Sequence, residues 1–349
     1  MESYLHSRKD QGWVLFMTSL KDVAALAGVS PSTVSRVING TMYVTDETRQ
    51  RVEEAIASVN YRPNLLAQSL RLKATRNIGL LVPEIAHPSF NLVIKYIEES
   101  AFKRGLNLLI FNTHNNYCRE AFAIDMLLRQ RINGIIFSRV SDESHVISMS
   151  RSTNTPMVVI DRSLNNEDIP NVIVDNYRAG VIAAEHLIAC GARRIATITG
   201  SFKIGLCRER FQGFRDTLER HGLEMDWKLV FEGDFNYEHG VKGVEHFLGE
   251  GLEFDALWGQ NDMIAAGAIS TLSRHGKHVP DDLLVMGMDD VQFAQMYYPS
   301  ITTIAQPYKD LCEAAVDCID KLTKGEEIEH FQMIYPPKLI VRESTTRGA

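Results

Sequence analysis

A short stretch near the N-terminus places hydroxyl side chains and one arginine at the start of an expected helix. In "GVSPSTVSRVING", Ser30 is a favourable N-cap, and the proline that follows begins the helix, where its missing N–H costs no hydrogen bond. The side chains that could reach outward are Pro31, Ser32, Thr33, Ser35 and Arg36, with Asn39 at the helix end. Short hydroxyl groups bond base edges or phosphates at close range, and an arginine can grip a guanine or the backbone. These residue types suit contact with a nucleic acid.

Two neighbouring apolar patterns predict the elements that hold this stretch. Ser19 and Asp22 resemble a capping box before a first short helix, and Gly28 permits a sharp turn after it. A third helix is expected from about Thr45, with an apolar stripe through Val52. Two short helices joined by a tight turn form a helix-turn-helix. The alternative at this point is a small three-helix bundle whose serines only cap helices.

Charge is distributed unevenly along the chain. Residues 17–76 hold eight Lys and Arg against five Asp and Glu, a net charge of +3, whereas the whole chain carries −7. Residues 1–16 are balanced, so the remainder carries −10. A basic head on an acidic body is compatible with one end that faces phosphates.

Length and composition indicate an ordinary globular protein of more than one domain. The chain has 349 residues, 45% of them hydrophobic and 23% charged, and no apolar run reaches the length of a membrane span. The first 16 residues lack the apolar core of a signal peptide. Five scattered cysteines without a C-x-x-C pair suggest packed, reduced thiols. We therefore expect a cytoplasmic protein with no membrane partner.

From Ile78 onward, apolar strand-like runs alternate with amphipathic helical stretches. The runs include "IGLLV", "NLLIF", "GIIF", "MVVI", "RIATIT", "ALWG" and "LLVMGM". This alternation is typical of parallel sheets covered on both faces. Because the strands are too many for one ordinary sheet, we expect two α/β lobes. The predicted fold class is an all-α helix-turn-helix head plus an α/β core of two doubly wound parallel-sheet lobes.

Motifs of the common enzymes are missing from the sequence. No G-x-G-x-x-G follows a strand, and the chain has no P-loop, H-E-x-x-H or G-x-S-x-G. His275 and His278 flank an expected turn rather than a metal site. Asp289 and Asp290 follow a strand and could suggest acid–base work, but adjacent residues rarely converge, and a strand end is equally a binding position. We predict a binding protein that is not an enzyme and needs no cofactor or metal.

The ordered set of segments resembles the LacI/GalR family of bacterial transcription regulators. The match begins with "LKDVAALAGVSPSTVSRVING", "VTDETRQRVEEAIASVNYRPNLLAQSLR" and "IGLLVPEIAHPSF". It continues through "VVIDR", "VDNYRAG", "RERFQGF", "NDMIAAGAI", "VMGMDD" and "PSITTIAQP", from Leu20 to Val341 in the same order. No single piece is decisive, but the ordered set is highly specific.

The resemblance implies a DNA-binding head, a hinge helix, and a core similar to periplasmic sugar-binding proteins, acting as a homodimer on a pseudo-palindromic operator. The DNA-contacting positions that the family shares hold Thr33, Ser35, Arg36 and Asn39 in this chain, with Asn39 on phosphates. The variable positions that distinguish operators hold Pro31 and Ser32. Leu70 stands where family members insert a leucine into the minor groove.

The domains implied are a head over residues 17–62, a hinge helix and linker over 63–76, and a two-lobed effector-binding and dimerisation core over 77–349. Residues 1–16 lie outside the resemblance, so either they form a disordered extension or translation starts at Met17. The C-terminus "VRESTTRGA" lacks the heptad-leucine tail of tetrameric relatives, which favours a dimer.

The resemblance also implies an effector site between the lobes. The corresponding positions are Phe90, Arg139, Asp161, Arg208, Phe235, Asn261 and Asp289. Aspartate and asparagine can hold vicinal hydroxyls, an arginine can donate a fork of bonds, and phenylalanines offer ring faces. Arg139 could serve an acidic or phosphorylated sugar, or be a solvated loop arginine.

A sugar or sugar derivative is the default effector of the family, which predicts a repressor of a carbohydrate-utilisation operon. In the family's purine-sensing branch an arginine occupies the position of Ile204, which weakens the alternative of a purine corepressor. A sugar-binding protein without a regulatory role is a further alternative.

Overall fold

The computed structural model describes residues 19–40, 43–61, 75–140, 154–163 and 169–347. The chain divides into two compact units at the junction of Thr75 and Arg76. The predicted N-terminal extension and the hinge segment with Leu70 lie outside the described residues. None of the described helices is both long and apolar enough to cross a membrane.

The N-terminal unit is a three-helix head. It contains α1 (Leu20–Ala27), α2 (Pro31–Asn39) and α3 (Asp46–Ser58). The expected capping box is confirmed, because Ser19 N and Asp22 Oδ2 lie 2.7 Å apart and the Ser19 hydroxyl accepts from Asp22 N. Gly28 ends α1 with a φ of 65°, a left-handed conformation that glycine adopts without strain. Fully buried valines at the centre hold the three helices together.

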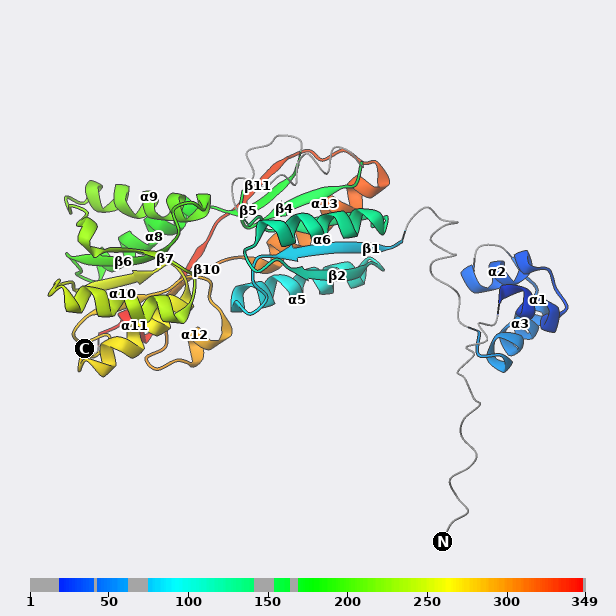
Figure 1. Ribbon diagram of the computed structural model, residues 1–349, viewed down its shortest axis with the longest axis horizontal. Coiled ribbons are helices and arrows are strands. Elements are labelled where there is room, and N and C mark those ends of the chain that lie inside the picture. The colour runs from blue at the N-terminus through cyan, green and yellow to red at the C-terminus, as the bar shows by residue number, and fades with distance from the viewer. Residues whose placement is uncertain (1–18, 41–42, 62–74, 141–153, 164–168, 348–349) are drawn as a thin grey trace, which may run out of the picture. The chain divides into compact units, whose positions relative to one another are not determined.

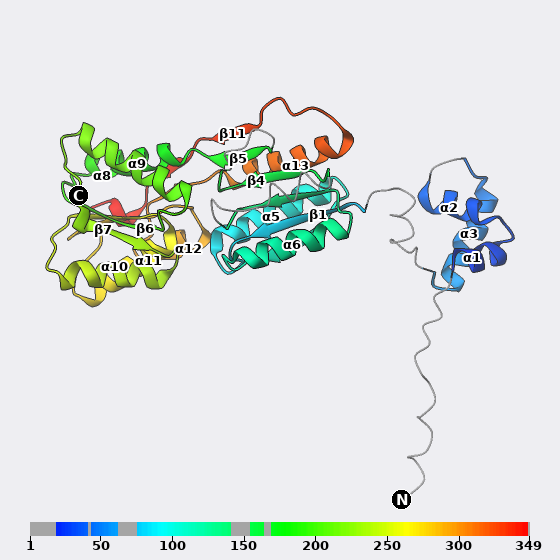
Figure 2. The ribbon, with the colours of Figure 1, turned by 45° about the horizontal axis from the view of Figure 1, so that its top comes forward.

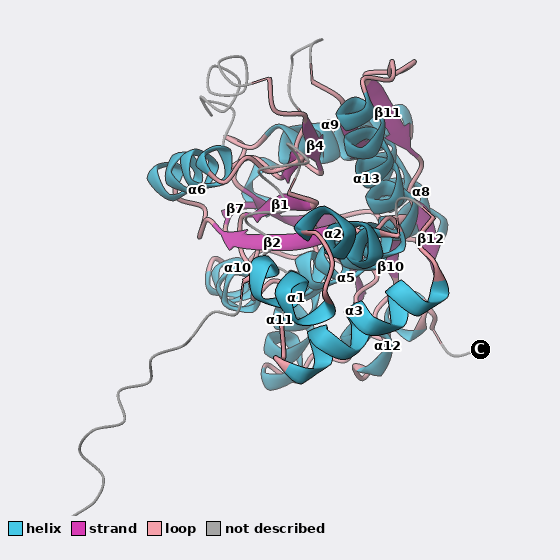
Figure 3. Ribbon diagram, turned by 90° about the vertical axis from the view of Figure 1, so that its right-hand side faces the viewer, coloured by secondary structure: helices cyan, strands magenta, loops and turns pink. Residues whose placement is uncertain are grey.

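The first lobe of the C-terminal unit has a six-stranded parallel sheet in the order β11-β5-β4-β3-β1-β2. Its strands are β1 (Asn77–Val82), β2 (Asn107–Asn112), β3 (Gly134–Phe137), β4 (Met157–Ile160), β5 (Asn171–Val174) and β11 (Gln332–Tyr335). Figure 3 shows β1 and β2 side by side at one edge. We call this sheet with its helices the N-lobe.

Side chains alternate across the N-lobe sheet and so build two apolar layers. Leu80 points to the layer formed with α5 (Pro88–Lys103) and α13 (Tyr308–Lys324). Its neighbour Leu81 points to the opposite layer, with α6 (Tyr117–Arg129). The sheet is therefore covered on both faces, as its continuous apolar strands predict.

The second lobe, the C-lobe, has a four-stranded parallel sheet in the order β7-β6-β8-β9. Its strands are β6 (Ile195–Gly200), β7 (Val230–Gly233), β8 (Ala256–Gly259) and β9 (Leu284–Met286). Figure 1 shows α8 (Asn176–Ala189) and α9 (Gly205–Arg220) on one face, and α10 (Tyr237–Gly249) and α11 (Asp262–Arg274) on the other. A short helix, α12 (Gln292–Met296), follows β9.

Three segments of chain connect the two lobes. The chain passes from β5 to α8, from β10 (Thr303–Ala305) to α13, and from β11 to β12 (Lys338–Ile340). Strand β11 pairs with β5 of the N-lobe (Figure 2), whereas β12 pairs antiparallel with β10, which continues from the C-lobe (Figure 3). The predicted fold class, a helical head plus two parallel-sheet lobes, is thus confirmed. Short multiple connections of this kind allow lobes to move as units about a hinge.

Candidate functional site

Helix α2 presents the polar residues that the sequence singled out. Pro31, Ser32 and Arg36 are exposed, and Ser32 and Arg36 stand one turn apart on the same face. The Ser30 hydroxyl lies 2.7 Å from that of Ser32 and 2.9 Å from that of Thr33. These three hydroxyls lie at the N-terminus of the nine-residue helix α2, where the helix dipole favours anions such as phosphate.

Ser35 differs from the other predicted DNA contacts because its exposed fraction is only 7%. It follows Val34, which is fully buried against α1 and α3, so it lies at the inner edge of the exposed face. Asn39 is the last residue of α2. The structure therefore offers Pro31, Ser32 and Arg36 most directly.

The predicted effector residues come together at the carboxyl ends of the strands of both lobes, where open α/β sheets bind ligands. In the N-lobe, Phe90 lies in the first turn of α5 and Asp161 directly follows β4. In the C-lobe, Phe235, Asn261 and Asp289 follow β7, β8 and β9. Arg208 stands apart from this group.

Asp289 is held rigidly and aims one oxygen at the site. Its exposed fraction is 5%, its φ of 111° is rare for a residue with a side chain, and its amide bonds Ile304 O at 2.9 Å. Oδ1 accepts from Gln306 Nε2 at 2.7 Å and from the Tyr308 hydroxyl at 3.3 Å. Within the described residues Oδ2 accepts no hydrogen bond, which leaves an acceptor for a ligand hydroxyl. Burial raises the pKa of Asp289, while neighbouring His87 and Arg210 lower it.

Asn261 caps helix α11 and reaches across to the other lobe. Its Oδ1 accepts from Ile264 N at 2.7 Å. Its Nδ2 donates to Phe235 O at 3.2 Å and contacts His87 Nε2 of the N-lobe at 3.0 Å. His87 was not among the sequence-predicted residues, although it immediately precedes the helix that carries Phe90.

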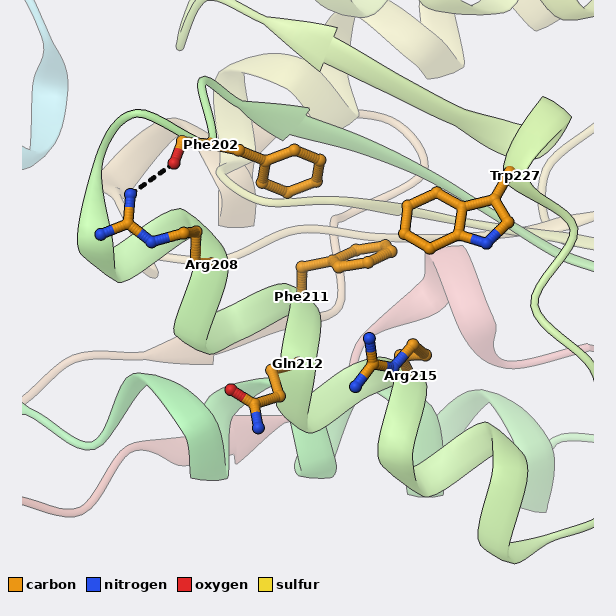
Figure 4. Close-up of a pocket in the computed structure, with 6 residues that line it drawn as sticks. All are labelled: Phe202, Arg208, Phe211, Gln212, Arg215 and Trp227. Atoms are coloured by element: carbon orange, nitrogen blue, oxygen red, sulfur yellow. Dashed lines mark hydrogen bonds between the residues drawn. The ribbon is translucent and has the colours of Figure 1, made fainter.

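The prediction of Arg208 needs a correction. Arg208 is exposed on α9, bonds Phe202 O, and lines an outward pocket of about 450 Å³ with the rings of Phe202, Phe211 and Trp227. Figure 4 shows its guanidinium turned to the Phe202 carbonyl.

Arg210, and not Arg208, lies at the carboxyl ends of the C-lobe strands, beside the loop that follows β8. It is 3% exposed and donates from Nε to Asn176 Oδ1 at 2.9 Å and from Nη1 to Gln260 O at 3.1 Å. Its Nη2 has no bonding partner among the described residues. Helical periodicity could have found it, because the buried stripe of α9 runs Leu206, Cys207, Arg210, Phe211, Phe214.

Arg139 is not the solvated loop arginine of the alternative interpretation, because its exposed fraction is 6%. Its guanidinium donates to the backbone oxygens of Ser163 and Arg162. Arg162 in turn donates to the backbone oxygens of Arg139 and Val140. The two arginines therefore clamp the loops that follow β3 and β4. This role gives no support to the idea that Arg139 binds an acidic sugar.

Gln260 is a second residue that the sequence analysis missed. It lies between Gly259 of β8 and Asn261, is fully buried, and neither Nε2 nor Oε1 has a hydrogen-bond partner among the described residues. Buried amides are nearly always bonded, so an unpartnered one at a strand's carboxyl end is a candidate ligand contact. No cluster of His, Cys, Asp or Glu in the described part of the chain could hold a metal ion.

Comparison with known families decides the class of protein. Residues 75–334 match the model described as periplasmic binding proteins and sugar binding domain of LacI family, and residues 19–64 match that of bacterial regulatory proteins, lacI family. The chain belongs to the lacI family. As a member of this family of DNA-binding repressors it is a transcriptional regulator and not an enzyme. The match to residues 19–64 removes the alternative of a sugar-binding protein without a regulatory role.

Individual relatives cover nearly the whole chain. The HTH-type transcriptional repressor PurR of Erwinia tasmaniensis is 34% identical over 335 residues, 95% of this chain and 98% of the relative. The ribose operon repressor of Haemophilus influenzae is 31% identical over 94% of this chain and 98% of its own. The lac repressor dimer bound to operator and the anti-inducer ONPF matches with a TM-score of 0.86 and 29% identity, covering 95% and 99% of the two chains. A CelR–cellobiose complex matches with a TM-score of 0.73 and 30% identity, covering 94% and 99%.

Proposed function

We propose that this regulator represses a carbohydrate-utilisation operon in the cytoplasm and that a sugar bound between the lobes sets its operator affinity. The observation that carries the proposal is that two buried residues at the site each keep one atom without a protein partner among the described residues: Asp289 Oδ2, an acceptor, and Arg210 Nη2, a donor. A sugar hydroxyl both donates and accepts, so it satisfies such a pair. Phe90 and Phe235 add apolar ring faces on the two lobes, which suit the C–H face of a sugar ring.

The alternative is a purine corepressor, and it is favoured by the relatives named PurR. Against it stands Ile204, an apolar residue at the N-cap of α9, where the purine-sensing branch has an arginine. A purine base has no run of vicinal hydroxyls for a carboxylate to accept from. The named relatives also include a ribose operon repressor and a cellobiose complex, so the sugar proposal has direct precedent in the family.

The three connections between the lobes explain how effector binding can be coupled to operator binding. An effector that contacts residues of both lobes changes their relative position, and the N-lobe continues into the segment that leads to the head. In a dimer, this alters the spacing of two hinge segments and thus operator affinity. The coupling is reciprocal, so operator binding changes effector affinity by the same factor.

A homodimer is supported by exposed apolar side chains near one edge of the N-lobe sheet. Phe102 of α5 is 76% exposed, Phe122 of α6 is 65% exposed, and Ile110 of β2 is 41% exposed. Strand β2 is an edge strand, and α5 packs beside it. Large exposed apolar side chains on neighbouring elements, here β2 and α5, suit an interface with another protein surface. A second copy of this chain also supplies the second half-site reader that a pseudo-palindromic operator needs.

The test is selection of genomic fragments by the purified full-length protein at low salt, followed by titration of the selected operator. Cellobiose, D-ribose, hypoxanthine and guanine are added separately. We expect a pseudo-palindromic operator whose affinity changes with a sugar and not with a purine base. A response to hypoxanthine or guanine alone would establish the purine alternative. Failure to select any fragment would contradict the operator proposal altogether.

A further inference from the structure

Two hydrogen bonds between the lobes lie close together: the Tyr308 hydroxyl donates to Asp289 Oδ1, and a second bond joins the N-cap residues of two helices. His87 is the N-cap of α5 in the N-lobe, and Asn261 is the N-cap of α11 in the C-lobe. His87 Nε2 and Asn261 Nδ2 lie 3.0 Å apart. The exposed fraction of Asn261 is 1%, so this contact closes over the amide that the family resemblance assigns to the effector.

The direction of this bond is fixed by the helix cap. Asn261 must turn its oxygen to Ile264 N, which lies 2.7 Å away, and so its nitrogen faces His87. An amide nitrogen only donates, which makes His87 Nε2 the acceptor and leaves the imidazole neutral with its proton on Nδ1. Nδ1 then donates to the Ser89 hydroxyl at 2.7 Å. Ser89 N approaches the same atom only to 3.4 Å, and we assign the tautomer from the two shorter contacts.

The amide of Asn261 has no donor left for a ligand in this arrangement. One of its two hydrogens is directed at Phe235 O, 3.2 Å away, and the other at His87. A sugar hydroxyl that accepts from Asn261 must therefore replace the imidazole nitrogen. His87 Nε2 stands where the oxygen of such a hydroxyl would stand.

We propose that His87 is an internal competitor of the effector, a neutral latch that occupies Asn261 and closes the lobes until an effector hydroxyl or a proton displaces it. This inference rests on the proposed effector site between the lobes. It adds to that proposal a residue that sets effector affinity and a pH dependence with a defined sign.

The charges around His87 agree with a neutral latch. Burial lowers the pKa of His87, and Arg210 and Arg162 act in the same direction. The carboxylates of Asp289 and Asp161 raise it in part. An imidazole released to water recovers an ordinary pKa of about 6.5. Effector binding that releases His87 therefore takes up a proton below this pH, and affinity for the effector rises as the pH falls from about 6.5.

The latch itself is tested by the distance between the lobes in the full chain without any effector. One dye is placed on the exposed thiol of Cys118 in α6 and another on Glu245→Cys in α10, with Cys190→Ser in every variant. Doubly labelled protomers are mixed with excess unlabelled chain, so that energy transfer reports one protomer of a dimer. We expect the wild type to be closed at pH 7.5 and more open at pH 5.5.

Two variants separate the latch from other effects of acid. His87→Gln keeps an acceptor that does not titrate, so the distance no longer depends on pH. Asn261→Asp keeps the oxygen that caps α11 but pairs best with a protonated imidazole, so the sense of the pH dependence reverses. His221→Gln, an exposed histidine at the end of α9, is the control and behaves as the wild type. A wild-type distance that does not change with pH overturns the latch.

Competition is tested by calorimetric titration with cellobiose and D-ribose at both pH values. His87→Ala removes the competing hydrogen bond, so the sugar that binds is held between about twofold and tenfold more tightly, with little pH dependence. Weaker binding by His87→Ala overturns the proposal, because His87 would then support the effector rather than compete with it. If neither sugar binds any variant while the lobe distance still follows pH as expected, the latch stands and the sugar effector fails.

Discussion

Arg210 Nε donates a 2.9 Å hydrogen bond to Asn176 Oδ1, and the two residues belong to helices that meet backbone to backbone. A Cβ on Gly180 of α8 would lie 1.9 Å from Arg210 O, and one on Gly213 of α9 would lie 2.0 Å from Tyr177 O. Only glycine allows this approach at either position. The crossing of α8 and α9 therefore places a buried guanidinium beside the carboxyl ends of the C-lobe strands.

A matched pair of substitutions tests which arginine serves the effector. Arg210→Lys keeps the charge but loses the planar fork that bonds both Asn176 and Gln260, so effector affinity falls by roughly tenfold to a hundredfold. Arg208→Lys, two residues away on the outer face, leaves it unchanged. Calorimetric titration with the sugar that alters operator binding measures both. Equal effects of the two substitutions would contradict the assignment of Arg210.

Operator recognition depends on an exposed arginine that contributes little to the fold. Arg36→Ala removes a side chain that could form two bonds with a guanine, so specific operator affinity falls by about 1–3 kcal/mol and discrimination between sequences is relaxed. Arg51→Ala on α3 removes the same charge from an exposed position and is the control. Fluorescence anisotropy on operator and on unrelated DNA distinguishes them. If Arg36→Ala weakens binding to both DNAs equally, Arg36 grips only the backbone.

We expect the Gln260 amide to contact the effector and to lower the stability of the folded protein when no effector is bound. Its buried amide lacks a partner among the described residues, so Gln260→Met, which has a similar shape, raises the free energy of unfolding by about 1–3 kcal/mol. The same change should reduce the response to the effector. Urea denaturation followed by circular dichroism measures the first effect. A clear loss of stability would show that the amide is satisfied in the folded protein.

Acid should destabilise the core through its buried histidines. Burial lowers the pKa of His239, although its bond to the Thr199 carbonyl raises it in part. The unfolded chain then binds the proton first, so the stabilisation is complete above about pH 6.5 and declines as the pH falls below it. His239→Gln should reduce the slope of stability against pH by at most about 1.4 kcal/mol per unit. Denaturation between pH 5.5 and 7 measures this slope. His221→Gln should leave it unchanged, and an unaltered slope in His239→Gln would contradict the prediction.

Local sequence patterns predicted the three helices of the head and the alternation of strands and helices along the rest of the chain. The caps at Ser19, Ser30 and Thr45 and the turn at Gly28 follow from interactions within four residues, which a sequence displays directly. The apolar runs likewise mark the buried strands. The pairing order of the strands and the exchange of β11 and β12 between lobes depend on contacts between distant residues, which periodicity cannot show.

The site was predicted less completely than the fold. Asn261 and Asp289 were predicted from the family resemblance, and the structure places them shortly after β8 and β9, where the sequence shows recognisable strands. Arg208 was predicted rather than Arg210 because matching motifs fixes a position only to within a residue or two, whereas the structure places Arg210 on the buried face of α9 and Arg208 on the exposed face. His87 was not predicted, because its contact with Asn261 joins residues that lie 174 positions apart in the sequence.

The most direct test of a sugar-controlled repressor is operator affinity with and without the sugar, measured for the wild type and for Asp289→Asn. The substitution replaces the free acceptor Oδ2 with a donor and leaves the DNA-binding head untouched. We predict that a sugar such as cellobiose or D-ribose changes wild-type operator affinity by about fivefold or more, and that Asp289→Asn binds the operator equally well but does not respond. A wild type that ignores every sugar, or an Asp289→Asn protein that responds like the wild type, would contradict the account.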